Sequence, residues 1–283
     1  MPSVTRPGGA SISYLMEGSG PALILHPGIS MPGGSVPRCA IEPLVAAGRT
    51  VIAIDPRDTG GSTRYDPSLI DPGAVLAGDF ATVPYTFDDM AGDMLAVLDD
   101  AGCESATWVG YSMGGNVVAS VQAQAPDRVD GLVYLEASPG FGSTLQAEDY
   151  GVLLRPVPTT RDEAIAWALD VLRWTLRDHF DEATQMPTAI TLVDDLGWWG
   201  IPLGHLAASI VGNPTITTAT PDESRTLILY GTGSAERDTS HFQAFAASLP
   251  GSTAIELGPY NHWFPEPGPW PTITDAIIHL ANR

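Results

Sequence analysis

The sequence contains no lysine. All thirteen cationic side chains are arginines, and they stand against 33 aspartates and glutamates, which gives a formal net charge of −20. An acidic surface of this kind repels phosphate backbones, so we expect no nucleic-acid partner. We interpret the charge as a solvated shell that keeps the protein soluble, and we favour this over the alternative that it steers a cationic substrate.

Cysteine is scarce as well. Cys39 and Cys103 are too few for a disulfide framework and have no metal-ligand spacing, so we interpret them as incidental thiols. No apolar run reaches the length of a membrane span, and the first twenty residues lack the pattern of a secretory signal. We therefore expect a cytoplasmic protein, monomeric or homodimeric, with no membrane partner and no cofactor.

Short β-rich runs alternate with helical patterns along most of the chain. Apolar runs at 21–28, 50–57, 105–111 and 129–137 are typical of buried parallel strands. Helical patterns cover 86–102, where Thr86 can serve as the N-cap, and 113–125. A last block of two strands and two helices, the helices near 239–249 and 271–282, follows residue 224. This alternation predicts an α/β fold with a mostly parallel sheet and helices on both faces.

The pattern changes between residues 138 and 224. This segment is helical, rich in loops and far too long to be a simple connection between two strands. We predict a helical cap inserted before the penultimate strand, with a core formed by 1–137 and 225–283. The segment carries four tryptophans, of which we expect two to face a pocket. Our candidates for contacts with a bulky apolar substrate are Trp174, Trp198, Trp199 and, outside the cap, Tyr111.

A G-x-S-x-G motif at 110–114 lies between a predicted strand and a predicted helix. A loose turn would explain it, but this context is the one that a nucleophile elbow requires. Glycines beside Ser112 would let strand and helix approach closely, and the N–H of Met113 would point at a developing oxyanion. We therefore predict that Ser112 is a nucleophile.

At this point the chain resembles the α/β-hydrolase family over nearly its whole length. The H-P-G segment at 26–28 is similar to the family's oxyanion loop, which implies that an amide at Gly28 or Ile29 joins Met113 in binding an oxyanion. The segment D-P-R-D-T-G-G-S at 55–62 resembles a family turn, with Asp58 where glycine is usual. Its form is similar to aclacinomycin methylesterase-like enzymes of natural-product metabolism.

A serine nucleophile also needs a base and an acid that orients the base. His262 follows a predicted strand near the C-terminus, where the resemblance places the catalytic histidine. For the acid, Glu136 ends the strand beside the nucleophile strand, in an L-E-A sequence that resembles haloalkane dehalogenases. The resemblance places the family's usual aspartate at position 234, which holds a serine here. Asp238 and Glu236 lie close to that position and are the alternative acids. His179 and His205 lie in the predicted cap, and either is a candidate for a substrate contact.

These residues predict an ester hydrolase that acts on a small molecule through an acyl-enzyme. Dehalogenases and epoxide hydrolases of this fold attack with aspartate, so a serine at position 112 argues against both. A cyclase or lyase of natural-product biosynthesis on the same fold is the alternative, supported by Ser234. A ligand receptor is a weaker one, because Ser112 and His262 are both in place.

Overall fold

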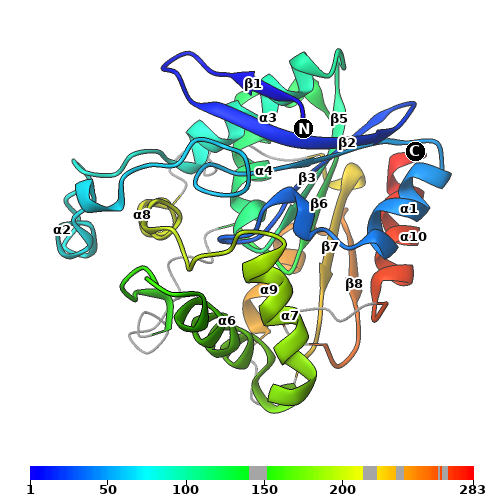
Figure 1. The fold of residues 1–283 in the computed structure, drawn as a ribbon. Coiled ribbons are helices and arrows are strands. Elements are labelled where there is room, and N and C mark those ends of the chain that lie inside the picture. Colours follow the sequence, from blue (N-terminus) through cyan, green and yellow to red (C-terminus); the bar gives the residue numbers. More distant parts are fainter. Residues whose placement is uncertain (140–151, 213–221, 234–238, 261, 263–266) are drawn as a thin grey trace.

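The computed structural model describes residues 1–139, 152–212, 222–233, 239–260, 262 and 267–283. Its centre is an eight-stranded sheet in the order β1-β2-β4-β3-β5-β6-β7-β8 (Figure 1). The strands are β1 Ser3–Thr5, β2 Ser11–Gly18, β3 Ala22–His26, β4 Thr50–Ile54, β5 Ala106–Tyr111, β6 Val129–Leu135, β7 Thr226–Tyr230 and β8 Thr253–Glu256. Strands β3 to β8 run parallel, whereas β1 and β2 pair antiparallel at one edge. The predicted α/β fold with a mostly parallel sheet is confirmed.

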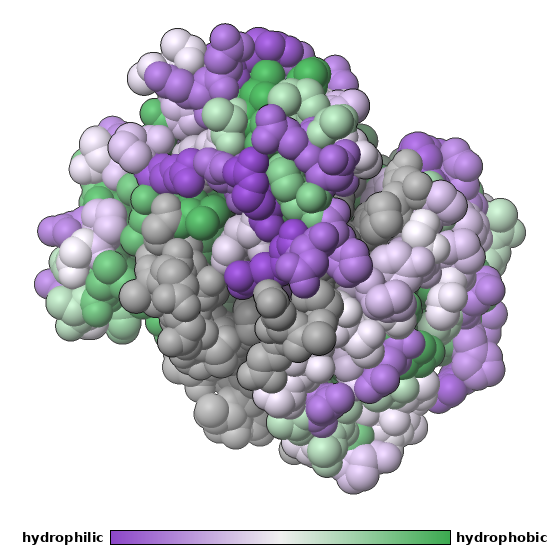
Figure 2. Space-filling view, turned by 90° about the horizontal axis from the view of Figure 1, so that it is seen from below, coloured by the Kyte–Doolittle hydropathy of each residue, from purple (hydrophilic) through white to green (hydrophobic). Residues whose placement is uncertain are grey.

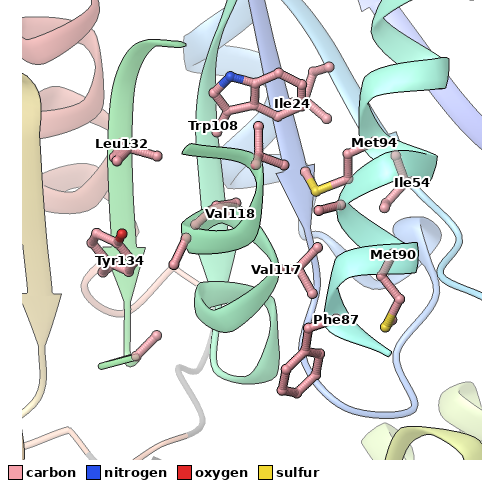
Figure 3. Close-up of a cluster of buried hydrophobic side chains, with 14 of the residues drawn as sticks. Ile24, Ile54, Phe87, Met90, Met94, Trp108, Val117, Val118, Leu132 and Tyr134 are labelled. Carbon is pink, nitrogen blue, oxygen red and sulfur yellow. The ribbon is translucent and has the colours of Figure 1, made fainter. Parts of the chain in front are cut away.

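Helices cover both faces of this sheet. Those of the core are α1 Arg38–Ala46, α2 Pro72–Leu76, α3 Phe87–Asp100, α4 Met113–Gln124, α9 Ser240–Ser248 and α10 Trp270–Ala281. One apolar cluster joins the sheet to α3, α4 and α9, and a second joins the opposite face to α1 and α10. Figure 3 shows the first of these clusters, in which Trp108 and Ile24 from the sheet face Val117, Val118 and Met94 from the helices. The two clusters fix the sheet, and with it the loops at its ends.

Helix α3 begins where the sequence predicts. Thr86 accepts a hydrogen bond from the N–H of Asp89 through its side chain, and the Asp89 carboxylate accepts from the N–H of Thr86 in return. This capping box satisfies two N–H groups that the first turn leaves without a helical partner. Helix α4 begins directly after Ser112, at Met113, as the elbow motif requires.

Between β6 and β7, three further α-helices have both of their ends within the described residues. They are α6 Arg161–Leu176, α7 Glu182–Asp194 and α8 Leu203–Val211. We call residues 152–212 the cap segment. It has its own apolar cluster, which contains Trp167 and Trp198, and it lies beyond one end of the strands in Figure 1. The division at 138 and 224 stays a prediction, because residues 140–151 and 213–221, which connect the cap segment to the core, lie outside the described residues. None of the helices in the described ranges has the length and apolar character needed to cross a bilayer.

Candidate active site

The carboxyl ends of the central strands bring the predicted site residues together. In the parallel ladders His26 of β3 stands beside Gly110 of β5, and Tyr111 of β5 stands beside Leu135 of β6. The residues that follow these strands therefore leave the sheet at one edge, a common place for ligand sites in α/β folds. These are the loop at 27–31, Ser112 and Glu136.

Ser112 sits on a tight strand-to-helix corner. Its backbone has φ 53° and ψ −119°, a conformation that side-chain-bearing residues rarely adopt. A Cβ atom at Gly110 would overlap the carbonyl of Gly114, and one at Gly114 would overlap the carbonyl of His26. The two glycines therefore allow the strand and the helix to approach closely at this corner. A hydrogen bond also holds the corner, because the N–H of Ser112 donates to the carbonyl of Leu135 at 2.9 Å.

A serine, a histidine and a glutamate form a continuous hydrogen-bonded chain. Ser112 Oγ lies 2.7 Å from His262 Nε2, and His262 Nδ1 lies 3.2 Å from Glu136 Oε2. The three residues come from the ends of β5 and β6 and from the segment after β8. This is the arrangement of nucleophile, base and orienting acid that serine hydrolases use.

Glu136 is buried, with 2% of its surface exposed, and it is held firmly. Its N–H donates to the carbonyl of Leu229 at 2.8 Å, and its Oε1 accepts from the N–H of Gly231. A buried carboxylate is costly without such partners, and here both of its oxygens have one. The alternative acids Asp238 and Glu236 lie outside the described residues.

Tyr111 contacts His262 directly. The two rings stack with centroids 5.6 Å apart and planes 22° apart, and the Tyr111 hydroxyl donates to the backbone carbonyl of His262. The tyrosine predicted to contact substrate therefore also supports the histidine.

A cavity of about 120 Å³ opens above Ser112 between the core and the cap segment. Its core wall includes Gly28, Ile29 and Met113, the residues predicted for an oxyanion site. The N–H of Met113 belongs to the first turn of α4, where amides have no partner within the helix. The cap wall is mainly apolar and includes Leu153, Val171, Leu172, Trp174, Leu192, Trp198 and Ile201.

The four cap tryptophans have different positions. Trp174 and Trp198 line the cavity above Ser112. Trp167 is buried in the cap cluster, where its Nε1 donates to the carbonyl of Val152. Trp199, predicted as a substrate contact, is 43% exposed and lines a second cavity on the other side of Trp198. Its place in the sequence beside Trp198 gave no sign that the two rings diverge.

The remaining histidines differ in role. His26 is buried and its Nδ1–H donates to the carbonyl of Pro27 at 2.7 Å, while burial lowers its pKa to about 3. His179 is exposed. His205 does not line the cavity above Ser112. It is a buried residue of α8, and its ring hydrogen-bonds to the backbone at Ser30 and Arg57. Sequence reasoning missed this contact, for which no motif gives a signal.

No cluster of three or more potential metal ligands occurs in the part of the chain that the structure describes.

Comparison with known proteins agrees with the fold. A family model described as alpha/beta hydrolase fold matches residues 21–186, more than half of the chain. Rhodomycin D methylesterase DauP from Streptomyces sp. (strain C5) is 39% identical over 107 residues, which cover 38% of this chain and 32% of that protein. The match thus spans about a third of that relative. The sn-1-specific diacylglycerol lipase ABHD11 of Danio rerio is 24% identical over 240 residues, or 82% of this chain and 70% of that protein.

Solved structures share the fold at low sequence identity. The enol-lactonase from Burkholderia xenovorans LB400 superposes with a TM-score of 0.64 at 18% identity, over 100% of both chains. Est816, described as an N-acyl homoserine lactone degrading enzyme, superposes with a TM-score of 0.66 at 19% identity, over 98% of this chain and 99% of that one.

Proposed function

Because the chain belongs to the α/β hydrolase fold family, we propose that it is a serine hydrolase that cleaves an ester or related acyl bond of a bulky apolar small molecule. One observation carries the proposal: Ser112 Oγ, His262 and Glu136 lie in a single hydrogen-bonded chain at the floor of a cavity. A serine alone is a poor nucleophile at neutral pH, and an adjacent base held by a carboxylate is what activates it.

The reaction follows from these contacts. Ser112 Oγ attacks the carbonyl carbon while His262 Nε2 takes the hydroxyl proton, and Glu136 stabilises the resulting imidazolium. The N–H of Met113 and an amide of the loop at 27–31, which we call the oxyanion loop, bind the negative oxygen. The intermediate collapses as His262 returns the proton to the leaving alcohol. Water, activated by His262, then hydrolyses the acyl-enzyme and frees Ser112.

The substrate class is inferred from the walls of the cavity. Trp174, Trp198 and the aliphatic cap side chains favour a large apolar group over a small polar one. The partial similarity to rhodomycin D methylesterase supports natural-product metabolism as the setting. A cyclase or lyase has weaker support, because Glu136 supplies the carboxylate whose absence at Ser234 favoured that alternative.

Active-site labelling tests the proposal. A fluorophosphonate probe should add one phosphonyl group to the folded protein at Ser112, and Ser112→Ala should remove the adduct in intact-mass spectra. A panel of p-nitrophenyl esters with increasing chain length should then show faster turnover for the longer, more apolar acyl groups. Folded wild type that takes up no probe and cleaves none of the esters would refute serine hydrolysis.

A further inference from the structure

We propose that two cap residues, His205 and Trp198, hold the oxyanion loop in its catalytic shape through Ser30. The cap would then complete the catalytic machinery as well as enclose the substrate. The inference rests on the proposed function, since the loop serves as an oxyanion donor only if Ser112 attacks an acyl group. In this account His205 and Trp198 are positioning residues.

His205 connects three parts of the molecule. It lies on α8, is completely buried, and has its Nδ1 3.0 Å from the backbone nitrogen of Ser30. Its Nε2 lies 2.7 Å from the carbonyl oxygen of Arg57, in the turn after β4. A backbone N–H only donates and a carbonyl only accepts, so the imidazole must be neutral, with its proton on Nε2. One ring thereby fixes the cap to the loops that follow β3 and β4.

The Arg57 end of this link is rigid. The Arg57 guanidinium forms two hydrogen bonds with the buried carboxylate of Asp93, at 2.7 and 2.8 Å. A charged pair with both members buried and hydrogen-bonded resists displacement, because breaking it leaves an uncompensated charge. His205 therefore transmits a fixed position from the core to Ser30.

Trp198 makes the second attachment. Its Nε1 donates to Ser30 Oγ at 2.8 Å, and both side chains are buried. The Trp198 ring packs edge-on against Trp167, with centroids 5.6 Å apart, so it is anchored within the cap cluster. Ser30 is thus held by its main chain from His205 and by its side chain from Trp198.

Ser30 needs this support because of its backbone. Its φ is 63°, a region that favours glycine, and it directly follows Ile29, whose amide is a candidate oxyanion donor. Strained residues persist only where their surroundings fix them. Farther along, the N–H of Gly33 donates to the core carboxylate of Asp55 at 2.8 Å. The segment that contains the oxyanion loop is consequently tied to the core at Gly33, just after the loop, and to the cap at Ser30.

A double-mutant cycle on Ser30 and Trp198 tests the inference. Trp198→Phe keeps an aromatic ring but removes the N–H that reaches Ser30, and Ser30→Ala removes the accepting oxygen. Each should lower kcat for a p-nitrophenyl ester about tenfold at nearly unchanged KM, because a misplaced oxyanion donor affects the transition state more than substrate binding. The double variant should be no slower than either single variant, since all three lack the same hydrogen bond.

Trp167→Phe is the matched control. It also removes a buried indole N–H from the cap, but one that donates to the carbonyl of Val152 and not to the oxyanion loop. Its kcat should stay within twofold of wild type. His205→Leu, which leaves the Ser30 N–H and the Arg57 carbonyl without their partner, should lower kcat about 100-fold if it folds.

A second readout needs no turnover. Amide hydrogen exchange in the peptide containing residues 28–31 should accelerate in Trp198→Phe and in Ser30→Ala but not in Trp167→Phe. Unchanged exchange in both Trp198→Phe and Ser30→Ala, or an effect of these variants on KM alone, would overturn the inference. If wild type takes up no fluorophosphonate, the proposed function fails separately, and the exchange rates alone decide whether the cap holds the loop.

Discussion

At the scale of single residues, backbone strain gathers around the candidate site. Among the residues that the structure describes, five other than glycine have positive φ, and four of these follow consecutive central strands. They are Ser30 after β3, Asp58 after β4, Ser112 after β5 and Glu136 after β6. Each such conformation costs roughly 1–3 kcal/mol, which the packing around it must offset. Strain of this kind is typical of sites where side chains are held in fixed positions for a reaction.

Asp58 explains its own departure from the family pattern. Its φ of 66° is one that glycine adopts easily, so the usual glycine and this aspartate share a backbone shape. The aspartate adds contacts that glycine cannot make: Oδ1 accepts from the N–H of Tyr65 at 2.6 Å, and Oδ2 accepts from the Tyr85 hydroxyl at 2.5 Å. The substitution therefore fixes the loop before Tyr65 and does not remove a site residue.

The first residue-scale prediction concerns the acid. Glu136→Gln keeps the shape and one acceptor for the Gly231 N–H but removes the charge that stabilises the imidazolium of His262. We expect turnover to fall by about four orders of magnitude, as when the triad carboxylate of a serine hydrolase is lost. The measurement is kcat on the best p-nitrophenyl ester, with the melting temperature recorded to show that folding is little changed.

Two control variants accompany Glu136→Gln. Glu256→Gln alters an exposed carboxylate at the end of β8, where it accepts from the Tyr230 hydroxyl at 3.0 Å, and should leave the rate intact. Asp238→Asn should also leave the rate nearly unchanged. Loss of activity in Asp238→Asn with normal activity in Glu136→Gln would instead assign the acid to the segment after β7.

At the scale of elements, sequence patterns predict what local chemistry determines. The sequence predicts the strands β3 to β8 and the helices α3, α4, α9 and α10 from short β-rich runs and helical patterns, and for α3 also from the N-cap Thr86. No prediction covers the helix α1, which contains Pro43, a residue type that usually kinks or ends a helix. The prediction also lacks the antiparallel strands β1 and β2. These two strands pair locally across residues 6–10, and only the pairing of β2 with β4 joins distant residues.

The same division holds for the site. Ser112 stands in a short motif with its own steric logic, and Glu136 could be placed from strand adjacency, so both were predictable as neighbours. His262 depended on the family resemblance. The contacts of His205 and Trp198 with Ser30 join residues that are 175 and 168 positions apart, and no local pattern encodes them.

An element-scale prediction separates the cap tryptophans. Trp174→Ala enlarges the cavity above Ser112 and should shift preference toward longer or wider acyl groups with little loss of stability. Trp167→Ala removes a buried ring from the cap cluster and should destabilise the protein by about 3–5 kcal/mol. Trp199→Ala, at an exposed position outside this cavity, should change neither property much. The measurements are kcat/KM across the ester panel and urea unfolding.

A different ranking would revise the position of the pocket. If Trp199→Ala changes substrate preference as strongly as Trp174→Ala, the second cavity beyond Trp198 belongs to the substrate path. If Trp174→Ala lowers stability with preference unchanged, its ring serves the cap cluster instead.

At the scale of the whole molecule, the charged surface contrasts with two buried histidines that stay neutral. Hydrophilic residues cover much of the face shown in Figure 2, in keeping with a solvated shell. Two buried histidines lie beneath this shell, with pKa values lowered by burial to about 3 for His26 and about 4 for His205. Both rings are neutral and hydrogen-bond to the backbone, so the folded protein disfavours the second proton that would charge them.

This exclusion predicts acid destabilisation with a defined sign. For His205, burial lowers the pKa from 6.5 to about 4, outweighing the Arg57 carbonyl and the nearby Asp58, which both raise it; Tyr85, edge-on at 6.2 Å, also faces the ring. Above pH 6.5 the ring is neutral in both states, so the free energy of unfolding is unaffected. As the pH falls toward 4, the unfolded chain binds a proton that the folded protein excludes. This one residue should therefore remove about 3 kcal/mol of stability, after which the loss stops growing.

Urea unfolding at intervals from pH 7 to pH 4, at high salt to screen the surface charge, measures this effect. Wild type should lose stability steadily over that range, and His205→Gln, which cannot take up the proton, should lose about 3 kcal/mol less. His279→Gln is the control, because His279 is exposed on α10 and its removal should leave the wild-type slope unchanged. Equal slopes for wild type and His205→Gln would mean that His205 titrates alike in the folded and unfolded states. The neutral ring assigned between Ser30 and Arg57 would then be wrong.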